Sequence, residues 1–140
     1  MKILYTAEAT ATGGRNGHIK SNNGILDVDV RTPKALGGAD DNYTNPEQLF
    51  AGGYAACFDS ALNLVIKQGK VSTGETTVTA EVSIGQIENG GFGLAVALSV
   101  NIPGVSFADA QALADRAHEV CPYSNATRGN IEVNIIVSNN

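Results

Sequence analysis

Short stretches of alternating hydrophobic and polar residues occur in both halves of the chain. Residues 4–12 set Thr and Glu against Tyr and Ala, a period of two that is typical of a strand with one wet face. Residues 22–24 (NNG) predict a hairpin turn, because Asn and Gly tolerate a positive φ. We predict strands at residues 4–12, 18–21, 25–30, 76–86, 94–101 and 131–137.

The longest apolar stretch has the features of a helix that is buried on most sides. Residues 45–47 (NPE) form its start, because Asn can cap, Pro suits the first helical position and Glu complements the positive end of the dipole. Apolar residues then occur on nearly every side up to about Lys67, and Gly69 ends the helix.

A second helix is predicted for residues 107–120, with Ser106 as a cap. Pro122 ends it, so Cys121 lies at a helix terminus. Residues 31–44 contain Pro33, a pair of glycines and a pair of aspartates and are predicted to form a loop. Strands, helix, strands, helix and strand in this order predict one α+β domain over residues 1–140, with mostly antiparallel sheet around a buried central helix.

The charge, the hydropathy and the number of cysteines argue against several classes of protein. The 140-residue chain carries a formal net charge of −5 and has no cluster of Lys or Arg, which argues against nucleic-acid binding through a basic face. We find no apolar stretch that predicts a membrane span and no signal peptide, so the cytoplasm is the expected compartment. Two cysteines are too few for a secreted disulfide scaffold.

The two cysteines, Cys57 and Cys121, leave three interpretations open. Each can be a structural cysteine, since free Cys is among the most buried residue types. With His18 and His118 they can also form a four-ligand metal site, although the spacing is not that of a zinc finger or ribbon. The third interpretation is a redox pair, for which the two Cα atoms must lie within about 7 Å.

A reactive Cys57 would need a cationic neighbour, because only the thiolate is a strong nucleophile and the middle of a helix offers little help from the dipole. The candidates are Arg15, Arg31, Arg116 and Arg128. Arg15 stands out because glycines on both sides give it a flexible mount, although a solvated turn arginine is an equal alternative.

Three segments resemble the organic hydroperoxide resistance (Ohr) proteins of the OsmC superfamily. Residues 44–58 read TNPEQLFAGGYAACF, residues 121–130 read CPYSNATRGN, and residues 9–17 read ATATGGRNG. They occur in the order found in that family, and the resemblance covers nearly the whole chain. It implies an OsmC-like α+β fold, with antiparallel sheets around long central helices in an intertwined homodimer.

The resemblance also implies a thiol-dependent peroxidase of the peroxiredoxin type. Cys57 matches the peroxidatic cysteine and Cys121 the resolving cysteine; Arg15 matches the catalytic arginine and Glu47 the glutamate that pairs with it. Members of the family are reduced by dihydrolipoyl groups on lipoylated proteins and need no metal, haem or flavin. The expected product of the first step is a Cys57 sulfenic acid, which condenses with Cys121 to a disulfide.

Apolar residues around Cys57 favour an alkyl or lipid hydroperoxide over hydrogen peroxide. The candidate pocket residues, each of which can instead be ordinary core packing, are Phe50, Tyr54, Phe58 and Phe92. Glu47 and Cys57 are ten residues apart on one predicted helix, about 15 Å along its axis. We therefore expect the Arg15–Glu47 pair that meets Cys57 to come from the other subunit.

The chain differs from the family pattern at a few positions. Gly52 replaces the usual alanine, the loop 39–43 is more acidic, and Asp59 follows Cys57 by two residues. Residues two apart point away from each other on a helix, so Asp59 should affect the Cys57 pKa only weakly. The alternative to an enzyme is a non-enzymatic redox-sensing or small-molecule-binding module on the same fold.

Overall fold

The computed structural model describes residues 1–140 and has the predicted α+β class. The chain divides into two compact units, Met1–Leu49 and Phe50–Asn140, which are described one after the other. The single domain over 1–140 stays a prediction.

The first unit contains a three-stranded antiparallel sheet in the order β1–β2–β3. Its strands are β1 (Ala9–Thr12), β2 (His18–Ser21) and β3 (Asp27–Asp29), with a 3-10 turn, η1 (Gly14–Asn16), between the first two. The strand predicted from residue 4 begins only at Ala9, which pairs with Ser21. The chain turns away at residues 22–24, so β2 offers residues 4–7 no partner strand.

Helix α1 (Pro46–Gly69) begins as its sequence predicts. The Asn45 side-chain oxygen accepts a hydrogen bond from the Gln48 amide at 2.9 Å, which satisfies one of the free N–H groups of the first turn. By length and hydropathy α1 could cross a membrane, contrary to the expectation that no stretch could. Core helices of globular proteins pass the same test, and six α1 residues are buried: Tyr54, Phe58, Ala61, Leu62, Val65 and Ile66.

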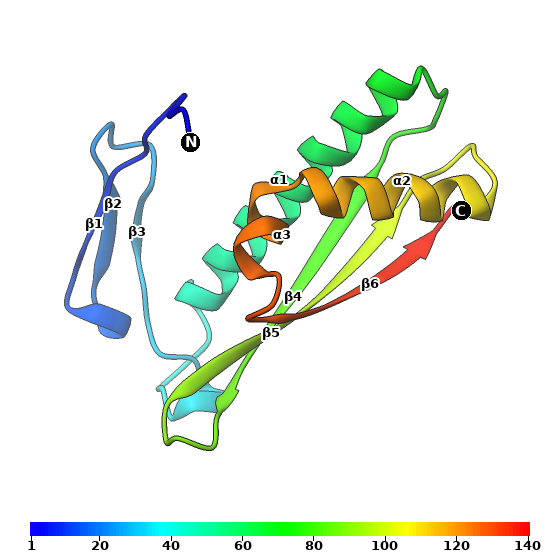
Figure 1. The fold of residues 1–140 in the computed structure, drawn as a ribbon. Coiled ribbons are helices and arrows are strands. Elements are labelled where there is room, and N and C mark those ends of the chain that lie inside the picture. Colours follow the sequence, from blue (N-terminus) through cyan, green and yellow to red (C-terminus); the bar gives the residue numbers. More distant parts are fainter. The chain divides into compact units, whose positions relative to one another are not determined.

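The second unit contains a three-stranded sheet in the order β4–β5–β6 (Figure 1). Strands β4 (Thr77–Gln86) and β5 (Phe92–Asn101) form an antiparallel hairpin, whereas β6 (Glu132–Ser138) pairs with β5 in parallel. The other strand pairs are antiparallel, as expected for a mostly antiparallel sheet, and the β5–β6 pair is the exception. Two helices return the chain between β5 and β6, which is the crossover that parallel strands require.

Alternation along β5 separates the two faces of this sheet. Val96, Leu98 and Val100 are buried, whereas Ala95 and Ser99 are exposed and Ala97 is half-buried. The buried side packs into one core cluster with residues of α1 and of the next helix, α2 (Phe107–Val120). The sheet therefore has one face on the core and one face open, as an alternating strand pattern predicts.

Two helices meet at Cys121. Helix α2 has the predicted bounds, and the Ser106 hydroxyl accepts from the Asp109 amide at 3.1 Å as its cap. Pro122 does end α2, but it also starts a short helix that sequence analysis missed, α3 (Pro122–Thr127). Proline is favourable at the first helical position because it has no N–H to leave unpaired there. Cys121 is thus the C-cap of one helix and the N-cap of the next.

Candidate active site

The two cysteines lie next to each other in the second unit. Cys57, in the middle of α1, is half-buried, and Cys121, at the junction of α2 and α3, is completely buried. Both are free thiols, and their sulfur atoms are 3.7 Å apart. A disulfide has an S–S distance of about 2.0 Å, so only a small shift separates this pair from a covalent bond.

Helix α3 directs a backbone donor at the Cys57 sulfur. The N–H of Tyr123, in the first turn of α3, makes a hydrogen bond that lowers the pKa of Cys57. The position of Cys57 in the middle of its own helix predicts little help from a helix terminus, but the donor comes from a different helix. The sequence signal for this donor is Pro122, because a proline that ends one helix is also favourable at the first position of the next.

The net effect of the second unit on Cys57 is nevertheless unfavourable to the thiolate. Burial raises the pKa of Cys57 above its ordinary value, the Cys121 thiol acts in the same direction, and the Tyr123 N–H opposes both. No cationic side chain of this unit contributes to the shift. The lowered pKa expected of a peroxidatic cysteine therefore needs a charge that residues 50–140 do not supply.

The arginine matched to the family's catalytic arginine lies in the first unit, and its predicted pair with Glu47 is formed. Arg15 Nη1 and Nη2 donate to the two carboxylate oxygens of Glu47 at 2.8 and 2.5 Å, a bidentate geometry. The ion pair lowers the pKa of the Glu47 carboxyl and raises that of the Arg15 guanidinium. Glu47 is in the first turn of α1, so the helix start orients the arginine.

The turn that carries Arg15 is held by backbone contacts with the end of β3. The Gly17 carbonyl accepts from the Val30 amide at 3.0 Å, and the Asn16 side chain accepts from the Thr32 amide at 3.1 Å. A Cβ at Gly17 would overlap the carbonyl of Thr12, so only glycine fits there. The mount predicted to be flexible is thus a tightly bonded turn.

The three other candidate arginines are occupied elsewhere. Arg31 donates to the carbonyls of Gly17 and Val30 and lies over the Tyr43 ring at 4.7 Å. Arg116 pairs with Glu119, its neighbour on α2.

Arg128 donates to the Asn125 side chain at 2.7 Å and to the backbone carbonyl of His118 at 2.7 Å. Of the four candidates, Arg15 is the one presented by a glycine-flanked turn and held by a carboxylate.

The aromatic residues near Cys57 divide into core and surface. Tyr54 and Phe58 are completely buried, which agrees with the core-packing alternative rather than with a pocket wall. Phe50 is half-buried and its ring packs against Tyr54 and Tyr123 at centroid distances of 6.1 and 6.0 Å. Tyr123, which is not among the predicted pocket residues, is therefore a better candidate for the apolar wall than Tyr54 or Phe58.

Phe92 is 67% exposed at the start of β5 and makes no ring contact with this aromatic group. The Asp59 carboxylate does not bond to Cys57. It accepts a hydrogen bond from the Thr76 hydroxyl at 2.6 Å. It does not contribute to the Cys57 pKa.

The structure brings together no group of three or more His, Cys, Asp or Glu side chains able to hold a metal ion. His18 has aspartate partners within the first unit, and His118 bonds to Ser124, so the four-ligand alternative has no geometric support.

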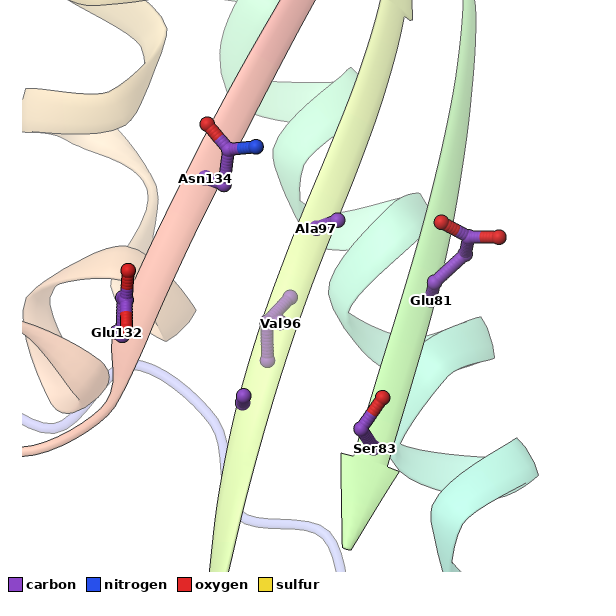
Figure 2. Close-up of a pocket in the computed structure, with 7 residues that line it drawn as sticks. Glu81, Ser83, Val96, Ala97, Glu132 and Asn134 are labelled. Atoms are coloured by element: carbon purple, nitrogen blue, oxygen red, sulfur yellow. The ribbon is translucent and has the colours of Figure 1, made fainter.

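A hollow on the second sheet is lined by neither cysteine. It has a volume of about 400 Å3 and lies on the open face of the second sheet, where it is lined by Glu81, Ser83, Ala95, Val96, Ala97, Glu132 and Asn134. Figure 2 shows the polar side chains of this set on the near face of the strands, with the helices behind the sheet. None of the predicted site residues lines it, so we do not assign the chemistry to this hollow.

Known proteins resemble this chain over its full length. The OsmC-like protein family matches residues 38–136, which include Glu47 and both cysteines. An organic hydroperoxide resistance protein from Xanthomonas axonopodis pv. citri (strain 306) is 54% identical over 138 residues, 98% of this chain and 96% of that protein. The chain belongs to the organic hydroperoxide resistance proteins of the OsmC-like family.

Other members of this family agree in sequence and in structure. The organic hydroperoxide resistance protein OhrA of Bacillus subtilis (strain 168) is 48% identical over 141 residues, with 96% of each chain covered. A crystal structure of an organic hydroperoxide resistance protein from Elizabethkingia anophelis has a TM-score of 0.97 at 72% identity and covers the whole of both chains. That coverage includes the Arg15 turn, which lies before the residues that the family match spans.

Proposed function

We propose that this member of the organic hydroperoxide resistance proteins is a thiol-dependent peroxidase that reduces alkyl or lipid hydroperoxides to alcohols. The observation that carries the proposal is the pair of free thiols with sulfur atoms 3.7 Å apart, one half-buried and one buried. The relatives named for resistance to organic hydroperoxides support the substrate class.

In the first step the Cys57 thiolate attacks the distal oxygen of the hydroperoxide. The O–O bond breaks, Cys57 becomes a sulfenic acid, and the leaving alkoxide takes a proton to become the alcohol. The Arg15 guanidinium stabilises both the thiolate and the alkoxide, since it stays charged and presents a planar fork of donors. Glu47 holds the guanidinium in place through the two bonds at 2.8 and 2.5 Å.

In the second step the Cys121 sulfur attacks the sulfenic sulfur of Cys57. A disulfide forms and water leaves, carrying the hydroxyl of the sulfenic acid and the proton of the Cys121 thiol. An external dithiol, a dihydrolipoyl group in our proposal, then reduces the disulfide by thiol–disulfide exchange. These steps require no metal or organic cofactor in the protein.

We place the arginine of the partner subunit at each Cys57. Two observations support this: burial raises the pKa of Cys57 without a compensating cation in residues 50–140, and Glu47 precedes Cys57 by ten residues on α1. Ten residues of α-helix span about 15 Å, too far for an arginine clamped by Glu47 of the same helix to reach the sulfur easily. The proposed protein is a cytoplasmic, intertwined homodimer with composite sites.

The apolar residues around Cys57 favour a substrate with a hydrocarbon tail. Phe50 and Tyr123 offer partly exposed rings, while the buried rings of Tyr54 and Phe58 support them from the core. Phe92 is exposed and free to contribute to the same apolar surface in a dimer. We expect discrimination against hydrogen peroxide, which has no tail to bury.

The test is steady-state reduction of cumene hydroperoxide, tert-butyl hydroperoxide and hydrogen peroxide with dihydrolipoamide, thioredoxin or glutathione as the reductant. We expect multiple turnovers with dihydrolipoamide and a higher kcat/KM for the organic hydroperoxides. Cys57→Ser is the control and should have no activity. Equal kcat/KM for hydrogen peroxide and the organic substrates would contradict the apolar-pocket argument, and activity with thioredoxin alone would contradict the donor.

The alternative is a redox sensor on the same fold, which would oxidise once and recycle slowly. The rate of alkylation of Cys57 at neutral pH distinguishes a peroxidase or a redox sensor from a protein whose cysteines are inert. A peroxidase or sensor thiol reacts quickly, whereas a buried thiol without a cation reacts slowly.

A further inference from the structure

A chain of hydrogen bonds, buried except at His118, joins the helices that carry the two cysteines but contains neither cysteine. The Tyr54 hydroxyl lies 3.0 Å from the Ser124 hydroxyl and 3.1 Å from that of Thr127. Ser124 in turn lies 2.8 Å from Nδ1 of His118. These contacts join α1, α2 and α3 in one polar network.

The members of the network repeat one spacing relative to the cysteines. Tyr54 is three residues before Cys57, His118 is three residues before Cys121, and Ser124 is three residues after Cys121. Residues three apart on a helix lie on the same face, about one turn from each other. The Tyr54–Ser124 hydrogen bond therefore joins the helical turn next to Cys57 to a turn next to Cys121, and the Ser124–His118 bond joins the turns on the two sides of Cys121.

Burial makes these contacts sensitive to loss. Tyr54 and Ser124 have no exposed surface and Thr127 is 2% exposed, yet no buried side-chain N or O atom of the protein lacks a hydrogen-bond partner. A buried hydroxyl that loses its partner costs the full desolvation of that group, which is more than a satisfied bond contributes. The helices can part at this point only by leaving such groups unpaired.

A neutral His118 can accept the hydrogen bond that the network requires of it. Burial lowers the pKa of His118, and Arg128 on the neighbouring helix end acts in the same direction, with Asp115 opposing. A neutral imidazole has one acceptor nitrogen, so Tyr54 can donate to Ser124 while Ser124 donates to His118. Arg128 also donates to the His118 carbonyl, which ties α2 to the end of α3 a second time.

We propose that the hydrogen-bonded network of Tyr54, Ser124 and His118 positions Cys121 for disulfide formation with Cys57 and thereby protects Cys57 from overoxidation. The inference rests on the proposed peroxidase function. The sulfur atoms must approach from 3.7 Å to about 2.0 Å, and the network holds the turns that carry both sulfur atoms. The three residues act as positioning residues and do not contact the reacting atoms.

The positioning matters because two reactions compete for the same sulfenic acid. Cys121 converts it to a disulfide with loss of water, whereas a second hydroperoxide oxidises it to sulfinic acid and leaves as a second alcohol. The first reaction depends on the geometry of Cys121 and the second on the peroxide concentration. A misplaced Cys121 should therefore appear as overoxidation at lower peroxide.

Tyr54→Phe is the sharpest variant, because it removes the hydroxyl and keeps the ring in the core. The protein is treated with increasing tert-butyl hydroperoxide, and intact mass separates the disulfide from the sulfinic acid of Cys57. We expect the ratio of sulfinic acid to disulfide to rise about fivefold at a given peroxide concentration, the factor that loss of the Tyr54–Ser124 hydrogen bond supplies. The rate of the first oxidation of Cys57 is measured in a single turnover, and the ratio is compared at equal extents of that first oxidation.

Matched variants separate positioning from loss of stability. Ser60→Ala removes a hydroxyl from the same helix that bonds only to its own backbone at Ala56, and should behave as wild type. Val65→Ala destabilises the core without touching the network and should lower the unfolding midpoint but not change the ratio. His118→Asn keeps a hydrogen-bonding atom near the Nδ1 position and should rescue what His118→Leu loses.

A wild-type ratio in folded Tyr54→Phe would overturn the inference, as would an equal rise in Val65→Ala. Diamide, which oxidises a dithiol directly, gives a readout that does not require peroxidase activity: Tyr54→Phe should form the Cys57–Cys121 disulfide more slowly than wild type. If wild type fails to reduce organic hydroperoxides but the diamide difference remains, the proposed function fails and the positioning role stands. If wild type is active and the diamide rates are equal, the positioning role fails.

Discussion

Gly52 and Gly53 are adjacent in α1 but differ in the space available for a Cβ atom. A Cβ at Gly52 would have no atom within 4 Å, whereas a Cβ at Gly53 would lie 3.0 Å from the Tyr123 hydroxyl oxygen. Gly53 therefore makes room for the tyrosine that follows Cys121 and Pro122. Gly52, where the family pattern has alanine, has no such role.

We expect Gly52→Ala to raise the free energy of unfolding by about 0.5–1 kcal/mol, because alanine is the better helix former. Gly53→Ala has the same gain in propensity, but it pushes the Tyr123 ring away and should be less stable than Gly52→Ala. Denaturant unfolding of the two variants beside wild type measures the difference. Equal stabilisation by both would show that the Tyr123 contact does not constrain Gly53.

At the scale of elements, the two histidines respond to pH in opposite directions. His18 on β2 bonds to Asp29 and Asp27, which raise its pKa above 6.5. His118 on α2 has a pKa below 6.5 because of burial and Arg128. A raised histidine stabilises the fold below pH 6.5 and loses this effect as the pH rises through its folded pKa; a lowered one costs stability as the pH falls below 6.5.

Thermal unfolding between about pH 5 and pH 9 checks both signs. In wild type the stability contribution of His18 declines above pH 6.5, and His18→Asn should lack this decline. The stability cost of His118 grows below pH 6.5, and His118→Asn should lack this cost. The neighbouring charges that set these shifts are Asp27, Asp29, Arg128 and Asp115, and they stay in place in both variants. Parallel profiles for wild type and either variant would contradict the pKa direction assigned to that histidine.

At the scale of the whole molecule, the question is whether one chain can build a complete site. We expect a heterodimer with Arg15→Ala in one chain and Cys57→Ser in the other to keep about half of the wild-type kcat. One site of such a heterodimer combines the intact cysteine with the partner subunit's arginine, while the other has neither.

Peroxide turnover by heterodimers purified with two different tags is the measurement. The two parent homodimers, each lacking one component of every site, are the controls. If the heterodimer is as inactive as they are, the sites lie within single chains.

Several elements were predictable because their local signals agree with their packing. The bounds of α2, the Asn45 cap of α1 and the alternation of β5 follow from residue type and period. The parallel pairing of β6 and the extent of β1 could not be predicted from residue type and period. Both depend on which strand is available as a neighbour, and a period of two carries no information about the partner.

The sequence alone determined the family, the two cysteines and the Arg15–Glu47 pair, because these rest on residue types in a specific order. Only the tertiary structure decided that the sulfur atoms lie 3.7 Å apart, that Tyr54 and Phe58 belong to the core, and that a hydroxyl network connects the helices. Distances between residues far apart in the chain depend on how helices pack, and packing is a property of the whole core rather than of any local segment.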